Sequence, residues 1–184
     1  MRPIPVAAPA GSSPDRRSRP AVGVAWAAAA LGTGHALVSA YWAAGGTALL
    51  DTIGGDIERW ARERHAGLGA AIWAVAALKL GVALAAPVLA GVGAGRLPAW
   101  TRGRVPRRLG WVAAVTLALY GGVLTVTGLL IQAGVIEAAA DADDRALAWH
   151  TYFWDPWFLL WGVAFGLSLR LARAERLAGR DAGR

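Results

Sequence analysis

The sequence contains no cysteine. A chain without thiols forms no disulfide, no thiolate metal site and no cysteine nucleophile, so these chemistries are excluded. Lysine is almost as scarce, because Lys79 is the single lysine among nineteen basic residues. The others are arginines, and all of them except Arg170, near the end of the last apolar run, lie outside these runs. A nucleic-acid-binding protein would gather its basic residues on a folded surface, so the net charge of +7 does not indicate nucleic acid as a partner.

Charged residues are also few. They make up 17% of the chain against 56% hydrophobic residues, and the mean hydropathy of +0.42 is too high for an ordinary soluble domain. Apolar runs cover residues 21–44, 66–95, 109–136 and 156–172. As a helix, the first run would be roughly 36 Å long, which exceeds a hydrocarbon core of about 30 Å. The alternative is a cleaved signal peptide, but the apolar core of a signal peptide has only about 7–15 residues. The sequence therefore predicts an all-α fold, a bundle of four transmembrane helices.

Arginines are concentrated at one end of the predicted spans. Residues 1–20 form a basic tail that we expect to be disordered, residues 96–108 form a basic loop, and residues 173–184 form a second basic tail. The connections 45–65 and 137–145 carry more acidic than basic residues. The positive-inside rule then places both termini in the cytoplasm of a multi-pass protein, which we expect in a bacterial cell membrane.

Two aspartates indicate where helices begin. Proline disfavours the α conformation in the preceding residue but is tolerated at the first helical position, and aspartate is a good N-cap. We therefore predict that the fourth span begins at Pro156, after Asp155, and that the aromatic segment 146–154 lies at the membrane surface. One longer helix kinked at Pro156 is the alternative. A short surface helix is expected at residues 56–64, capped by Asp56.

Four polar residues form a candidate intramembrane site. The span lengths and directions place His35, Lys79 and Tyr120 within about a turn of the membrane midplane, and Ser39 lies one turn from His35 on the same helical face. A lysine at the bilayer centre costs about 2.5–3.5 kcal/mol on insertion scales, so it is a candidate functional residue. The simpler interpretations are a lysine that snorkels into a wet crevice and a histidine that serves helix packing.

A second candidate site lies towards the outer face. Asp51, Trp42 and Asp155 are the residues that could form it, although a solvated loop carboxylate, an interfacial tryptophan and a helix cap are the simpler interpretations. The remaining histidines, His65 and His150, lie in outer connections and form no pair with metal-ligand spacing. We therefore predict neither a metal site nor a cofactor.

Two longer motifs carry a resemblance to a known family. The stretches are "HALVSAYWAAGGTALLDTIGG" at 35–55 and "WDPWFLLWGVAFGL" at 154–167, with Lys79 and the pair Leu97–Pro98 between them. Over about residues 24–170 the chain resembles a family of small four-span bacterial membrane proteins of unknown function. The resemblance implies a four-helix membrane fold and implies no activity.

These patterns favour a binding or accessory membrane protein over an enzyme. Its expected partners are membrane lipids, a second copy of the chain or another membrane protein. One alternative is a small membrane-embedded enzyme for a lipid, isoprenoid or quinone-like substrate, with His35 or Asp155 as the acid–base group. The other is an oligomeric transporter whose path is lined by His35 and Lys79.

Overall fold

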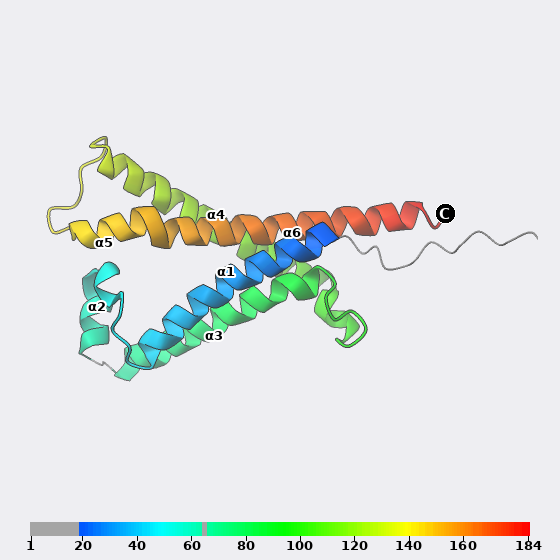
Figure 1. Cartoon of the computed structure of the whole chain (residues 1–184), viewed down its shortest axis with the longest axis horizontal. Helices are drawn as coiled ribbons and strands as arrows, with labels where there is room; N and C mark the ends of the chain where they lie inside the picture. Colours follow the sequence, from blue (N-terminus) through cyan, green and yellow to red (C-terminus); the bar gives the residue numbers. More distant parts are fainter. Residues whose placement is uncertain (1–18, 64–65) are drawn as a thin grey trace, which may run out of the picture.

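A computed structural model describes residues 19–63 and 66–184 of the chain (Figure 1). Every regular element in these residues is helical, and four helical stretches are long and apolar enough to cross a membrane. The predicted all-α fold with four long apolar helices is therefore confirmed. The elements in chain order are α1 (Arg19–Ala43), η1 (Leu50–Thr52), α2 (Gly55–Arg62), α3 (Ala66–Leu89), η2 (Ala99–Arg102), α4 (Arg104–Gln132), α5 (Asp144–Trp149), the π-helical turn η3 (His150–Trp154) and α6 (Asp155–Asp181).

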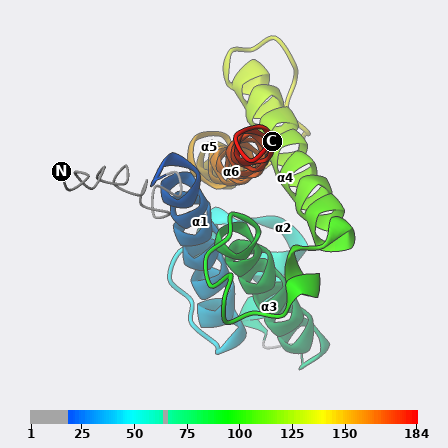
Figure 2. The same ribbon diagram turned by 90° about the vertical axis from the view of Figure 1, so that its right-hand side faces the viewer.

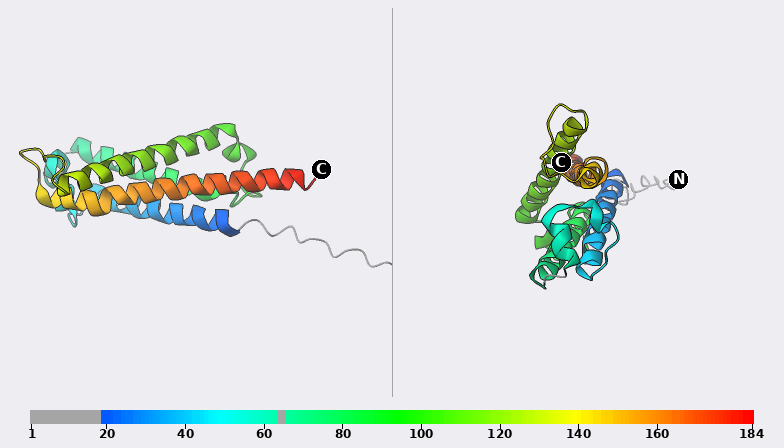
Figure 3. Two further views of the ribbon diagram at one scale, coloured as in Figure 1. Left: turned by 90° about the horizontal axis from the view of Figure 1, so that it is seen from above. Right: turned by 90° about the vertical axis from the view of Figure 1, so that its left-hand side faces the viewer.

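The long helices form an open arc rather than a closed bundle. Helix α6 packs between α4 and α1, and α1 packs along α3 (Figures 2 and 3). Helices α3 and α4 make few contacts although they are consecutive in the chain, so the arc is open along one side. Helix α1 begins and α6 ends at the same end of the molecule as η2 (Figure 1).

The helix ends differ from the predicted span limits. Helix α3 ends at Leu89 rather than near residue 95, because Gly91 and Gly93 adopt positive φ angles of 102° and 70°, which break the α conformation. Helix α4 begins at Arg104, ahead of the predicted 109. Of the predicted N-terminal tail, residues 1–18 lie outside the described residues. The predicted C-terminal tail continues α6 almost to the end of the chain.

The fourth span follows the alternative of one long helix through Pro156. Residues Asp144–Asp181 are helical throughout. Proline lacks an N–H, and its ring clashes with the carbonyl four residues earlier in a regular helix. Here the wider turn η3 precedes it, and the Asp155 N–H bonds five residues back to the His150 carbonyl. Asp155 therefore does not cap the helix; it is a buried residue within it.

Close packing between α4 and α6 depends on glycines. A Cβ added at Gly162 would overlap the backbone of Ala114 and Ala118 on α4, and one at Gly121 would overlap the backbone of Leu159 on α6. Small residues let helix backbones approach in membranes, where van der Waals packing replaces the hydrophobic driving force. Alanines serve the same purpose between α1 and α3, and the buried core comprises Ala25, Ala28, Ala83, Ala86, Leu89, Ala114, Trp161, Phe165 and Leu169.

The connection from α1 to α3 begins with two glycines that end α1. The Gly45 N–H bonds to the Trp42 carbonyl and the Gly46 N–H to the Tyr41 carbonyl, with Gly45 at φ 92°. This is a Schellman motif. Helix α2 follows where a short helix was predicted, but the predicted cap was wrong: Gly54 holds the N-cap position, and Asp56 lies in the first turn.

Candidate functional site

The Lys79 side chain links α3 to α1. Its Nζ donates to Ser39 Oγ at 2.9 Å and lies 3.1 Å from His35 Nδ1. Lys79 is the central residue of the apolar stretch Gly69–Leu89. His35 and Ser39 are 4% and 3% exposed, so both lie inside the molecule rather than on its surface. The structure therefore brings three of the four proposed intramembrane residues into direct contact.

An aromatic wall from α6 and η3 covers the histidine. The centroid of the His35 ring lies 4.2 Å from that of Phe158, 5.2 Å from that of Trp157 and 5.8 Å from that of Trp154. Lys79 Nζ lies 5.4 Å from the Phe158 ring centroid, close enough for a cation–π interaction. Three helical segments thus meet around one basic, aromatic centre.

Hydrogen bonds to distant parts of the chain hold this wall in place. The Trp157 indole N–H donates to the Leu31 carbonyl on α1 at 3.0 Å, and the Trp154 indole N–H donates to Thr52 Oγ1 at 3.0 Å. Thr52 lies in η1, is fully buried and itself donates to the Leu49 carbonyl. Sequence reasoning missed Thr52 as a positioning residue, since Thr52 and Trp154 are 102 residues apart and no local pattern links them.

The charge of Lys79 is stabilised without an acidic partner in the described part of the chain. An ammonium at the bilayer centre costs about 2.5–3.5 kcal/mol, and a hydrogen bond to a charged group contributes about 1.5–3 kcal/mol. The bonds to Ser39 and His35 therefore offset the cost. A lysine ammonium has three N–H donors, so one remains beyond these two bonds.

The second ring nitrogen of His35 is unsatisfied. Nε2 is buried and finds no hydrogen-bond partner among residues 19–63 and 66–184. When Nδ1 accepts a hydrogen bond from the Lys79 ammonium, Nε2 carries the proton of the neutral ring and is a donor. Buried polar groups in proteins almost always have a partner, so an unpaired one calls for an explanation.

Tyr120 lies beside this centre rather than in it. Its ring meets the edge of Phe158 at a centroid distance of 5.3 Å, and half of the residue is exposed. Tyr120 and Lys79 therefore both lie near the Phe158 ring, and no hydrogen bond joins them among the described residues.

The residues of the outer-face candidate site have separate partners. Asp51 pairs with Arg145 at 2.8 Å. The Trp42 indole donates to the Ala48 carbonyl, and the Asp155 carboxylate lies 3.2 Å from His150 Nδ1. Among the described residues, no hydrogen bond or ion pair joins Asp51, Trp42 and Asp155 to one another. Asp51 links η1 to α5, whereas the bonds of Trp42 and Asp155 are local, to residues six and five positions away in the chain.

The chain was compared with known proteins. Residues 32–165, which include all of the contacts around Lys79, match the sequence profile of a family described as "Protein of unknown function (DUF3995)". The chain belongs to the DUF3995 family. This confirms the resemblance to a family of unknown function. No curated protein and no solved structure matches the chain.

Proposed function

We propose that this DUF3995 protein binds a lipid-soluble molecule within the membrane, at the centre formed by Lys79, His35 and Ser39. The observation that carries the proposal is that the buried His35 Nε2 has no hydrogen-bond partner in the described residues. The other nitrogen of the same ring contacts the Lys79 ammonium, which has one further N–H. Two donors without acceptors in an apolar environment favour a ligand that supplies the acceptors.

The geometry favours a ligand whose head carries an oxygen acceptor. Carbonyl, carboxylate and phosphate oxygens can each accept from an ammonium and from an imidazole N–H. The faces of Phe158, Trp157 and Trp154 give the centre an apolar wall against which a hydrophobic body can pack. A few polar groups in a mostly aromatic surrounding are typical of small-molecule sites.

Binding is preferred to catalysis because the two titratable groups of this centre, Lys79 and His35, contact each other and no carboxylate joins them among the described residues. Aspartate and glutamate are common proton-transfer groups in acid–base catalysis. The buried carboxylate that the sequence offered for this role, Asp155, is instead bonded to His150. The proposal is therefore a binding or accessory protein.

Mass spectrometry of molecules that co-purify with the protein tests the proposal. We expect a specific lipid-soluble compound to accompany the wild-type protein and to fall at least tenfold in Lys79→Met and in His35→Ala. Leu84→Met is the matched control, because Leu84 is an exposed residue of the same helix as Lys79 and lies outside the contacts described above. Equal recovery of every compound from the wild type, Lys79→Met and His35→Ala would overturn the proposal.

We also infer that both termini lie in the cytoplasm of a bacterial cell. The arginine-rich end of the helices, which includes η2, is then the inner end. The absence of cysteine makes labelling of single introduced cysteines unambiguous. A membrane-impermeant maleimide applied to intact cells is expected to label Ala139→Cys and to spare Ala99→Cys until the membrane is permeabilised; both positions are exposed. The reverse pattern would contradict the orientation.

A further inference from the structure

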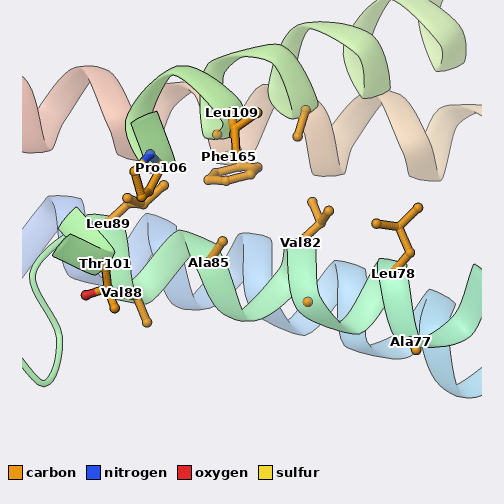
Figure 4. Close-up of a pocket in the computed structure, with 13 residues that line it drawn as sticks. Ala77, Leu78, Val82, Ala85, Val88, Leu89, Thr101, Pro106, Leu109 and Phe165 are labelled. Carbon is orange, nitrogen blue, oxygen red and sulfur yellow. The ribbon is translucent and has the colours of Figure 1, made fainter. Parts of the chain in front are cut away.

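An apolar groove runs along the open side of the arc, between α3 and α4 (Figure 4). Its volume is about 440 Å³, within the range of about 300–1,000 Å³ of small-molecule sites. Thr101, at one end, is the single polar side chain that lines it. The residues that line it are Ala77, Leu78, Gly81, Val82, Ala85, Val88, Leu89, Thr101, Pro106, Leu109, Gly110, Ala113 and Phe165.

The polar end of the groove is rich in arginine. Arg102 follows Thr101 and Arg107 follows Pro106, so each arginine adjoins a residue that lines the groove. The Nε atoms of both are buried without a hydrogen-bond partner in the described residues. Arg102 also donates from a terminal nitrogen to the Ala94 carbonyl, which holds its guanidinium at this end.

A helix begins at the same end. Helix α4 starts at Arg104, and its N-cap, Gly103, provides no side-chain hydrogen bond. The first turn of a helix presents N–H groups and a partial positive charge, which favour a nearby anion. Together with the five arginines of residues 96–108 it makes this end of the groove basic, next to an apolar length.

We propose that this groove binds an anionic phospholipid, with one acyl chain between α3 and α4 and the phosphate at Arg102 and Arg107. Arginine matches phosphate geometry well because its planar fork can donate two parallel hydrogen bonds. Basic pockets at the ends of transmembrane helices attract anionic headgroups more generally. The site is separate from the Lys79 centre, and the inference does not rest on the proposed function.

The length of the groove fits an acyl chain. From Ala77 to Leu89 the groove follows roughly 18 Å of α3 at 1.5 Å per residue, close to the depth of one leaflet in a hydrocarbon core of about 30 Å. Its lining is apolar except for Thr101 at one end, as an acyl chain below a polar headgroup requires.

Native mass spectrometry of protein reconstituted with defined lipids tests the site. The protein is stripped of lipid in detergent and exposed to an equal mixture of phosphatidylglycerol and phosphatidylcholine. We expect the wild type to retain phosphatidylglycerol at least fivefold over phosphatidylcholine, and the double variant Arg102→Gln/Arg107→Gln to retain the two equally. Arg108→Gln is the matched control, because Arg108 is an exposed arginine of the same first turns of α4.

A second variant blocks the apolar length without touching the arginines. Gly81 lines the groove, and a Cβ added there meets no atom within 4 Å, so the side chain of Gly81→Leu begins in open space. We expect Gly81→Leu to lose retained phosphatidylglycerol while its thermal unfolding stays unchanged. Equal lipid retention in the wild type and in both variants would overturn the inference, as would a dimer in the wild type that Gly81→Leu converts to a monomer.

Discussion

Replacing His35 by alanine is expected to destabilise the protein by about 2–4 kcal/mol. The change removes one of the two hydrogen-bond partners of the Lys79 ammonium at the centre of its span. It also leaves a cavity under the aromatic wall of Phe158, Trp157 and Trp154, to which the ring is packed. The midpoint of unfolding in mixed micelles of increasing dodecyl sulfate content measures the loss.

The double variant separates the charge effect from the cavity effect. Lys79→Met in the His35→Ala background removes the under-solvated ammonium, so we expect it to restore about 1–2 kcal/mol. His150→Ala is the control variant, because the His150 ring bonds to Asp155 and is not a partner of Lys79. Its effect is expected to add independently to that of Lys79→Met. Simple additivity for His35 and Lys79 would show that the two residues do not act as one unit.

Replacing Gly162 by alanine is expected to destabilise the protein by about 1–3 kcal/mol, although the change adds one methyl group. The added carbon would overlap the backbone of Ala114 and Ala118, and a backbone cannot move aside as a side chain can. Helices α4 and α6 would have to separate along their whole contact. Gly166→Ala is the matched control on the same helix, because its added carbon has only ordinary contacts, at 3.7 Å from the Trp111 ring and 3.8 Å from Ala114 Cβ.

The same unfolding measurement distinguishes the two glycine variants. We expect Gly162→Ala to unfold at a lower dodecyl sulfate fraction than the wild type, and Gly166→Ala to unfold within about 0.5 kcal/mol of it. If both variants matched the wild type, the close approach of α4 and α6 described here would be wrong.

Helix lengths allowed part of the candidate site to be predicted from the sequence. A rise of 1.5 Å per residue gives the depth of a residue in a span of known ends, and this placed Lys79 and His35 at similar depth. The 3.6-residue period placed Ser39 on the face of His35, and in the structure both residues contact Lys79. Helix α1 ends at Ala43, next to the predicted limit of the first span at residue 44.

What depth does not determine is which helices are neighbours and how each is rotated. Tyr120 was predicted at a similar depth, yet it contacts Phe158 and makes no hydrogen bond to Lys79 among the described residues. The aromatic wall depends on η3, a π-helical turn that has about one more residue per turn than an α-helix. The extra residue changes the direction in which Trp154 points and the hydrogen-bond pattern ahead of Pro156. Its anchor, Thr52, comes from a different connection. Such features depend on tertiary packing and have no periodic signal in the sequence.

The ¹⁵N spectrum of the His35 ring in lipid nanodiscs tests the central claim most directly, since it reports on the nitrogen that has no hydrogen-bond partner among the residues the structure describes. The spectrum is recorded for protein with its co-purified molecules, after these are stripped, and after a membrane lipid extract is added back. The account predicts that the Nε2 signal shifts on stripping and returns on addition, while the Nδ1 signal, set by Lys79, changes only in Lys79→Met. An Nε2 signal that is the same in all three samples would contradict the account.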